Sequence, residues 1–301
     1  MLLVTGCSGP SAKYFFKKLS ENNYKGQIRC IVRKSSNINH LKKYKLKLSF
    51  VYGDIRDEIF LVNSMKDIEV VLHIANIKFS ENIVRAGSKV GVSWFICVHT
   101  AAVYSKYTKL SSKYNSIEKK LISNHSNVTI LRPSLIYGTG GDPLTTNDKK
   151  KDRKVWMIIK FIHRYNFFLV FGSGKTLLQP VHCKDLGEAY YSVLLNKKNT
   201  FGKNYNLSGR NKISYLSMIK TISSYLEKKI IVVHLPIWLS FIVVKTLSLI
   251  PIISISINTE QILRMNEDRI FSWQKARSDF GYSPLTFEEG VKMEIDNYLN
   301  K

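Results

Sequence analysis

The sequence of 301 residues predicts an α/β fold, a doubly wound parallel sheet joined to a smaller, discontinuous C-terminal lobe. Two observations predict this fold. Short apolar runs alternate with helical stretches through the first half, which is typical of parallel strands linked by crossover helices. A glycine-containing turn directly follows the first apolar run, where such sheets bind their ligands. Apolar residues form 45% of the chain, which suffices for a large core.

Six apolar runs account for the strands of the predicted sheet: residues 2–4, 28–32, 49–52, 70–74, 94–98 and 128–131. Helical stretches separate or follow them: 11–19, 57–65, 82–89, 156–165, 185–196 and 213–226. We expect residues 1–133 and 178–210 to form a unit that binds a dinucleotide. Residues 134–177 and 211–301 are expected to form the substrate lobe.

The turn after the first run predicts a pyrophosphate site. Gly6 permits a tight turn, Gly9 lets the backbone approach the phosphates, and Ala12 lets the next helix pack on the strand. Pro10 suits the first helical position, and the helix N-terminus offers unpaired N–H groups to the phosphates. The expected cofactor contacts of this turn are Gly6, Cys7, Ser8, Gly9, Pro10 and Ser11.

The end of the second run indicates which dinucleotide is bound. This run ends in Val-Arg-Lys-Ser at 32–35, and the sequence holds no Asp or Glu between residues 22 and 53. A carboxylate would bind the free ribose hydroxyl of NAD, whereas an arginine accommodates the 2′-phosphate of NADP. Arg33 therefore favours NADP, with NAD as the alternative.

The net charge and the cysteine spacing restrict the classes of ligand and metal that the protein is expected to bind. Lys and Arg number 46 against 22 Asp and Glu, which gives a net charge of +24 and indicates an anionic partner, a phosphorylated ligand or an acidic lipid. Nucleic acid is not expected, because no motif that reads RNA or DNA accompanies the charge. The four cysteines lack metal-ligand spacing, which predicts reduced thiols and no metal site. Met1 runs directly into the first strand, so we expect no signal peptide and a cytoplasmic protein.

Six segments carry a family resemblance: Tyr-Gly-Asp-Ile at 52–55, His-Ile-Ala-Asn at 73–76, Cys-Val-His-Thr-Ala-Ala-Val-Tyr at 97–104, Leu-Arg-Pro-Ser-Leu-Ile-Tyr-Gly at 131–138, Gln-Pro-Val-His-Cys-Lys-Asp-Leu at 179–186 and Phe-Gly-Tyr-Ser-Pro at 280–284. In this order and spacing they resemble the extended short-chain dehydrogenase/reductase family, of the NAD(P)-dependent epimerase/dehydratase type. That resemblance implies a Rossmann-type fold and a nucleotide sugar as the anionic substrate.

The resemblance also implies individual contacts. Asp54 and Ile55 would bind the adenine, and Ala75 and Asn76 would line the cofactor after the fourth strand. The remaining implied positions are Pro133 and Leu135 for the cofactor, and Tyr104, Ser134 and Gly172 for the substrate.

Chemistry in the family resembled depends on a Ser or Thr and on a Tyr-x-x-x-Lys pair. Thr100 stands at the Ser/Thr position. On the helix expected to carry the pair, anchoring on Glu118 places Leu110 at the Tyr position and Tyr114 at the Lys position. The other anchor makes Tyr114 the base, with Glu118 where Lys belongs. Both leave the pair broken, so Thr100 and Tyr114 are the catalytic candidates. A non-catalytic NADP(H)-binding sensor or scaffold is the alternative to an active oxidoreductase.

Two stretches of the second lobe stand apart. Residues 138–153 are polar with a charge run, which predicts a loop at the edge of the cleft. Residues 236–257 form the most apolar run, but Lys245 and Pro251 interrupt it. We therefore expect a buried helix, or a helix packed on a partner subunit of a homodimer, rather than a membrane span. Peripheral contact with an anionic membrane is the alternative, because Trp238 suits lipid headgroups.

Overall fold

The computed structural model describes residues 1–107, 109–139, 154–236, 238–239, 264 and 267–300. Its main feature is a seven-stranded sheet in the order β11-β6-β5-β4-β1-β2-β3, in which all neighbours run parallel. This order places β1 beside β4, where the strand order reverses, as in dinucleotide-binding sheets. The strands are β1 (Leu2–Thr5), β2 (Gln27–Val32), β3 (Lys47–Tyr52), β4 (Val70–His73), β5 (Trp94–Val98), β6 (Val128–Pro133) and β11 (Asn204–Leu207).

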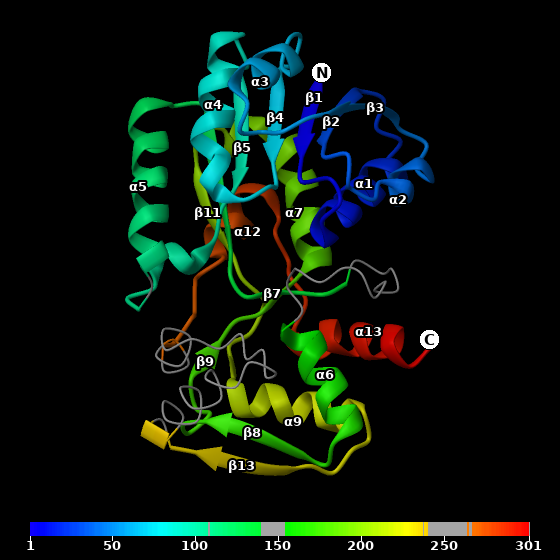
Figure 1. Ribbon diagram of the computed structural model, residues 1–301, viewed down its shortest axis with the longest axis vertical. Helices are drawn as coiled ribbons and strands as arrows, with labels where there is room; N and C mark the ends of the chain where they lie inside the picture. The colour runs from blue at the N-terminus through cyan, green and yellow to red at the C-terminus, as the bar shows by residue number, and fades with distance from the viewer. Residues whose placement is uncertain (108, 140–153, 237, 240–263, 265–266, 301) are drawn as a thin grey trace.

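Helices cover both faces of the sheet, which confirms the predicted doubly wound fold (Figure 1). One face packs on α1 (Pro10–Glu21), α2 (Asn39–Lys42) and α7 (Cys183–Leu195), and the other on α3 (Glu58–Ser64), α4 (Ser80–Lys89) and α5 (Lys109–Asn124). Neighbouring residues of β1 show the alternation, since Leu2 and Val4 enter one apolar cluster and Leu3 enters the other. Because both faces are buried, the strands read as continuous apolar runs.

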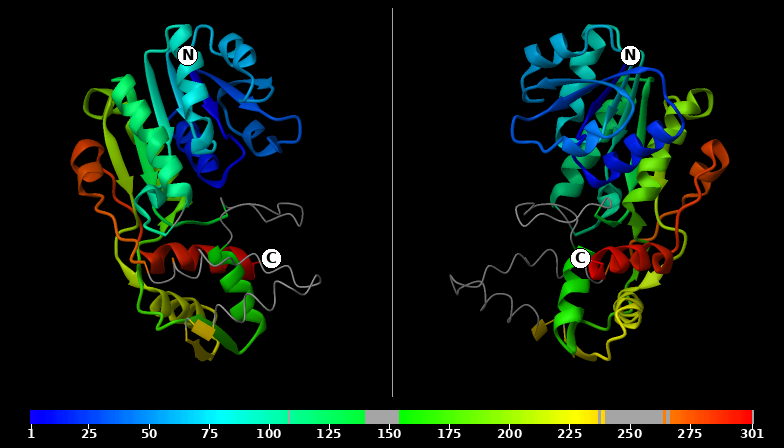
Figure 2. Two further views of the ribbon diagram at one scale, coloured as in Figure 1. Left: turned by 60° about the vertical axis from the view of Figure 1, so that its left-hand side comes forward. Right: turned by 90° about the vertical axis from the view of Figure 1, so that its right-hand side faces the viewer.

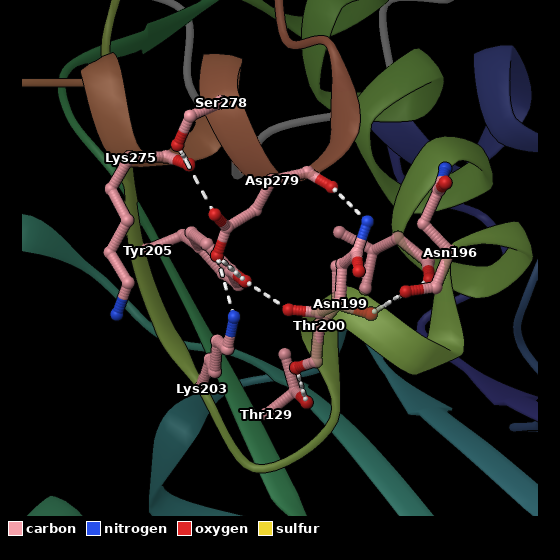
Figure 3. A network of polar contacts seen from close by, with 10 residues as sticks. Thr129, Asn196, Asn199, Thr200, Lys203, Tyr205, Lys275, Ser278 and Asp279 are labelled. Carbon is pink, nitrogen blue, oxygen red and sulfur yellow. Dashed lines mark hydrogen bonds and ion pairs between the residues drawn. The ribbon is translucent and has the colours of Figure 1, made fainter.

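Polar contacts tie the edge strand β11 to two helices from different parts of the chain, α8 (Lys197–Thr200) and α12 (Gln274–Phe280) (Figure 3). The Tyr205 hydroxyl donates to Asp279 Oδ2 at 2.7 Å, and Lys203 Nζ lies 3.1 Å from the same oxygen. Asn199 Nδ2 donates to the Asp279 backbone oxygen at 3.2 Å. The edge of the sheet is thus covered rather than open to another chain.

The smaller lobe is built around a two-stranded parallel sheet, β8 (Phe167–Phe171) with β13 (Ile231–Leu235) (Figure 2). One face of this sheet packs on α6 (Lys154–Arg164) and α9 (Tyr215–Tyr225), and α13 (Phe287–Leu299) completes the cluster. Short strand pairs connect the lobe to the main sheet: β7 (Ile136–Tyr137) with β10 (Val181–His182), and β9 (Leu177–Leu178) with β12 (Ile213–Ser214).

The predicted elements recur with small shifts at their ends. One prediction was wrong, because residues 213–214 are a strand and not the start of a helix. They pair with β9, and the Ser214 hydroxyl accepts from the Ser217 N–H at 3.0 Å, so Ser214 caps α9 from outside. The four cysteines are buried and free, as predicted.

Two predicted stretches fall wholly or mainly outside the described residues. They are the polar loop at 138–153, beyond residue 139, and the apolar run at 236–257, beyond residue 239. Among the residues that the structure describes, no helix is long and apolar enough to cross a membrane.

Candidate cofactor and substrate site

The turn after β1 has the geometry of a phosphate-binding loop. Gly6 adopts φ 76°, and a Cβ there would lie 2.8 Å from the Ala75 backbone nitrogen, so the turn presses against the end of β4. The Gly9 N–H donates to the Gly6 carbonyl at 3.1 Å and closes the turn. A Cβ on Gly9 would meet only that carbonyl oxygen, at 3.3 Å, within 4 Å among the described atoms. The space beside Gly9 and ahead of α1 therefore fits a pyrophosphate.

The side chains of the turn contribute little to that site. The Cys7 thiol donates to the Val4 carbonyl at 3.2 Å, and burial raises its pKa well above the usual value. Cys7 can therefore offer a ligand only its backbone. Ser8 is exposed, Pro10 is the first helical residue as predicted, and Ser11 is buried with its hydroxyl 3.5 Å from that of Tyr190. Binding here depends on backbone N–H groups and the positive end of α1.

The adenosine end of the site carries charged groups. Arg33 is exposed where β2 ends, and its backbone N–H donates to the Ser36 hydroxyl at 3.2 Å. Asp54 is exposed after β3, where hydrogen bonds from Arg56 hold its pKa below the usual range and the charge of Arg33 adds to the effect. Ile55 packs beside the apolar cluster under the sheet.

Residues after β4 are organised by a buried histidine. His73 Nδ1 lies 2.7 Å from the Thr5 hydroxyl and Nε2 lies 3.3 Å from the Asn76 carbonyl oxygen. Burial lowers the pKa of His73 to about 3, so it is neutral at physiological pH. The Asn76 side chain accepts from the Lys78 N–H at 3.0 Å and caps a short helix, η1 (Ile77–Phe79). Ala75 lies between them, against Gly6.

A cavity of about 440 Å³ opens beyond the carboxyl ends of β5 and β6. Three residues predicted separately from the sequence line it together: Thr100, Tyr104 and Ser134. Leu135, predicted as a cofactor contact, also lines it, and Pro133 ends β6 just before it. Ligands of such sheets bind at this edge, so the cavity is the candidate substrate site.

Thr100 and Tyr104 flank a short helix, η2 (Ala101–Tyr104). The Thr100 hydroxyl accepts from the Ala102 N–H at 3.1 Å, and its own proton can still be donated. Tyr104 is 48% exposed and its hydroxyl donates to Asn206 Oδ1 at 3.1 Å. The Arg132 guanidinium lies over the Tyr104 ring, 5.7 Å from its centre, which holds the ring at the wall of the cavity.

A buried ionic network supports this wall from behind. Glu118 of α5 accepts from Arg132 Nε at 2.7 Å and contacts His99 Nδ1 at 3.0 Å. His99 Nε2 lies 3.0 Å from the Ser80 hydroxyl. Burial alone would raise the pKa of Glu118, but the hydrogen bonds of His99 and Arg132 outweigh it and hold the pKa below its usual value. The network fixes α5 against β5 and β6.

Tyr114 lies one helical turn before Glu118. It is half-buried and packs against the apolar cluster beneath the sheet. The Leu110 side chain lies outside what the structure describes. The roles of Thr100 and Tyr114 in catalysis therefore stay predictions, with Thr100 facing the cavity and Tyr114 packed in a core cluster.

The cavity also holds two arginines that sequence reasoning missed, Arg264 and Arg269. Their Nε atoms are buried and have no hydrogen-bond partner among the described residues. Burial, with the neighbouring charge of Arg264, lowers the pKa of Arg269 to about 10. The adjacent carboxylates are engaged elsewhere, since Glu267 accepts from the Ser105 hydroxyl at 2.6 Å and Asp268 from the Leu177 N–H at 2.8 Å. An anion in the cavity could accept hydrogen bonds from both Nε atoms.

Two predicted substrate contacts have other partners. The Ser134 hydroxyl donates to the Gln179 carbonyl. Gly172, at φ 75°, closes the turn after β8, where its N–H donates to the Leu235 carbonyl at 2.7 Å. Gly172 is not among the described residues that line the cavity, so its contact with substrate stays a prediction.

This geometry defines a doubly wound α/β protein with a glycine turn after β1 and a cavity at the carboxyl edge of its sheet that is lined in part by two arginines. A sequence model of the NAD dependent epimerase/dehydratase family matches residues 2–125. Over that segment the chain is similar to the NAD-dependent epimerase/dehydratase family.

The chain is similar to three known proteins, one by sequence and two by structure. The mitochondrial NADH dehydrogenase (ubiquinone) 1 alpha subcomplex subunit 9 of Arabidopsis thaliana is 28% identical over 109 residues, which are 36% of this chain and 24% of that protein. The match thus spans about a quarter of that relative. The dTDP-glucose 4,6-dehydratase of Bacillus anthracis in complex with NAD superposes with a TM-score of 0.74 at 18% identity, over 100% of this chain and 96% of that one.

The UDP-glucose 4-epimerase of Thermotoga maritima with UDP-glucose superposes with a TM-score of 0.72 at 18% identity, over 99% of this chain and 98% of that one. At these identities the two structures establish the shared fold, including the small second lobe.

Proposed function

We propose that the protein is an NAD(P)-dependent oxidoreductase of the epimerase/dehydratase type that acts on a nucleotide sugar or a related anionic sugar. The observation that carries the proposal is the cavity in which Thr100 shares a wall with Arg264 and Arg269. The two arginines, whose Nε atoms are buried without a hydrogen-bond partner among the described residues, match the charge of a diphosphate. Thr100 lies in the same cavity, where a sugar attached to that diphosphate would reach.

Different residues would bind the cofactor, position the substrate and transfer the proton. The turn from Gly6 to Ser11 would hold the dinucleotide by its pyrophosphate, and Arg33 would pair with the 2′-phosphate of NADP. The dinucleotide, when bound, supplies the hydride acceptor or donor. The Thr100 hydroxyl would donate to the reacting oxygen of the sugar and hold it in place. Tyr114 remains the candidate group for proton transfer.

Substrate binding tests the proposal most directly. Isothermal titration of the dinucleotide-loaded protein should give affinity for UDP-glucose or dTDP-glucose and none for free glucose at the same concentration. Arg269→Gln should weaken that affinity about tenfold or more, because a charge-assisted hydrogen bond contributes about 1.5–3 kcal/mol. Arg277→Gln removes an exposed arginine of α12 and serves as the matched control, with unchanged affinity expected. Equal affinities for UDP-glucose and glucose would contradict the proposal.

A second candidate function is a non-catalytic NADP(H)-binding sensor or scaffold. The packing of Tyr114 on the core cluster favours it, because a general base must reach the proton that it removes. The two functions differ in turnover. An enzyme should convert bound cofactor between its oxidised and reduced forms when a nucleotide sugar is added, measured by absorbance, whereas a sensor should bind cofactor without converting it.

A further inference from the structure

The sheet of β8 and β13 has one buried face and one face in contact with solvent. Parallel register sets Ile231 beside Phe167 and Val233 beside Leu169. These four side chains are 71%, 41%, 41% and 40% exposed, in that order. The alternate residues of β8 enter the core of the lobe, so the exposed face follows from the two-residue period of the strand. Parallel sheets are normally covered on both faces, whereas the outer face of this one is exposed and apolar.

The position of this face separates it from the site already described. β8 and β13 form the end of the molecule farthest from the seven-stranded sheet, and α9 and α6 lie between them and the rest of the chain (Figures 1 and 2). Trp238 follows the end of β13 and is 66% exposed. Neither the cofactor turn nor the cavity uses these residues. Contiguous exposed apolar side chains of this kind mark a surface that binds something.

Charge around the face identifies the chemistry of its partner. Residues 154–177 and 211–235, which form the layer of α6, β8, α9 and β13, contain one acidic residue, Glu227, and eight basic ones. All eight are exposed: Lys154, Lys160, Arg164, Lys175, Lys212, Lys220, Lys228 and Lys229. Lys175 follows β8 by four residues, and Lys228 and Lys229 lie just before β13. An apolar face with Lys near the ends of its strands is a surface that an anionic bilayer binds, through apolar insertion and attraction to its headgroups.

We propose that the outer face of β8 and β13, with the lysines near the ends of its strands, docks the protein on an anionic membrane surface. A second copy of this chain fits less well, because a two-fold contact would bring the same excess of positive charge against itself. The tryptophan beyond β13 suits the headgroup region, where its ring and N–H meet both environments. The protein would bind on the bilayer rather than across it.

Vesicle co-sedimentation of the full chain tests the proposal. The protein should sediment with vesicles that contain about 30 mol% phosphatidylglycerol in phosphatidylcholine, and at least tenfold less with phosphatidylcholine alone. Ile231→Glu should reduce binding to the anionic vesicles at least tenfold, since it places a carboxylate in the apolar centre. Ile59→Glu is the matched control, because Ile59 is 76% exposed on α3 at the other end of the molecule. That variant should bind like the unmodified chain.

A second pair of variants separates charge from apolar contact. Lys228→Glu with Lys229→Glu should also lower binding at least tenfold, whereas Lys119→Glu with Lys120→Glu, an exposed pair on α5, should lower it less than threefold. Sedimentation velocity of the unmodified protein and of Ile231→Glu measures their oligomeric state and so tests whether a second copy of the chain covers this face. A dimer that Ile231→Glu dissociates would overturn the proposal in favour of a second copy. So would equal binding to both vesicle types, or full binding by Ile231→Glu.

Discussion

The turn after β1 and the helix α5 both pack on the seven-stranded sheet, but they differ in what they offer a ligand: the turn offers backbone groups and the helix offers side chains. The turn offers a positive-φ glycine, a glycine with open space beside it and a helix N-terminus, and none of these needs a particular side chain. Helix α5 is the element from which the resemblance to the epimerase/dehydratase type implies catalytic side chains. In this chain the buried carboxylate of that helix is Glu118, which is already engaged by Arg132 and His99.

From this difference we expect cofactor binding and hydride-transfer chemistry to be separable in this chain. A site made of backbone tolerates Cys7 and Ser8 between its glycines, because their side chains point away or into solvent. A catalytic site made of side chains, by contrast, depends on the identity of each residue. The predictions below therefore perturb the two regions independently.

Gly9→Val should produce the largest effect, a loss of dinucleotide affinity of at least about 100-fold. The Gly9 backbone lies at φ −75° and ψ 156°, which valine adopts readily, so the fold should persist. The branched side chain would occupy the space in which the pyrophosphate approaches α1. Fluorescence titration with NADPH measures the affinity, and a melting curve checks the fold. Unchanged affinity in a normally melting variant would show that the phosphates bind elsewhere.

Thr100→Val should lower kcat by about 100-fold on a confirmed nucleotide sugar, while Tyr114→Phe should lower it less than about tenfold. Thr100 lines the cavity and can hold the reacting oxygen, whereas Tyr114 packs against the core cluster. Steady-state kinetics of both variants under one set of conditions makes the comparison. The reverse order, with a large loss only at Tyr114, would mean that α5 supplies the base after all and that the two regions are less separable than they look.

Arg33→Asp should reverse the preference between the two dinucleotides. We expect the unmodified protein to bind NADPH about tenfold more tightly than NADH, because Arg33 is exposed at the end of β2 and can pair with the 2′-phosphate. The variant should instead favour NADH. Lys47→Asp, an exposed substitution at the start of β3, controls for the change in net charge. Equal affinities of the unmodified protein for both dinucleotides would refute the assignment.

The smallest effect concerns Asp185, at the junction of the two lobes. Its carboxylate accepts from the Leu285 N–H at 3.2 Å, and burial raises its pKa from 3.8 to about 6. A raised pKa favours the folded state at low pH, and this contribution is lost as pH rises from about 4 through 6. The loss amounts to roughly 3 kcal/mol at most, since one pKa unit corresponds to about 1.4 kcal/mol.

Asp185→Asn removes this titration. The Tm of the variant minus that of the unmodified protein should therefore increase by several degrees between pH 4 and pH 7. Asp296→Asn, an exposed carboxylate of α13, should give a difference that is flat across the same range. A flat difference for Asp185→Asn as well would mean that Asp185 is ionised in the fold at no cost.

The sequence predicted six strands of the main sheet because strands buried on both faces are continuous apolar runs. It did not predict β11, which reads Asn-Tyr-Asn-Leu, because an edge strand held by polar contacts lacks that signal. The sequence also did not predict the pairing of β8 with β13. Their paired residues lie about sixty positions apart, and no local sequence pattern indicates the contact.

The candidate site also contains residues that the sequence predicted and residues that only the structure revealed. Gly6 and Gly9 were found because they lie in the turn after an apolar strand, and Thr100 was found through the family resemblance. The structure brings Thr100, Tyr104 and Ser134 to one cavity. The sequence did not single out Arg264 and Arg269, because what marks them is a buried Nε without a hydrogen-bond partner among the described residues, and burial exists only once the chain has folded. Glu118 stood out as an alignment anchor, but its partners Arg132 and His99 come from two other elements.

The contact between Asp279 and Tyr205 has a consequence for synthesis on the ribosome. The chain is made from its N-terminus, so β11 leaves the ribosome well before α12 does. Until then the last strand of the sheet lacks its cover, and an uncovered edge is a template for pairing with another nascent chain. The nucleotide-binding unit is therefore not finished when its own strands have been made, and its completion must wait for residues of the C-terminal segment.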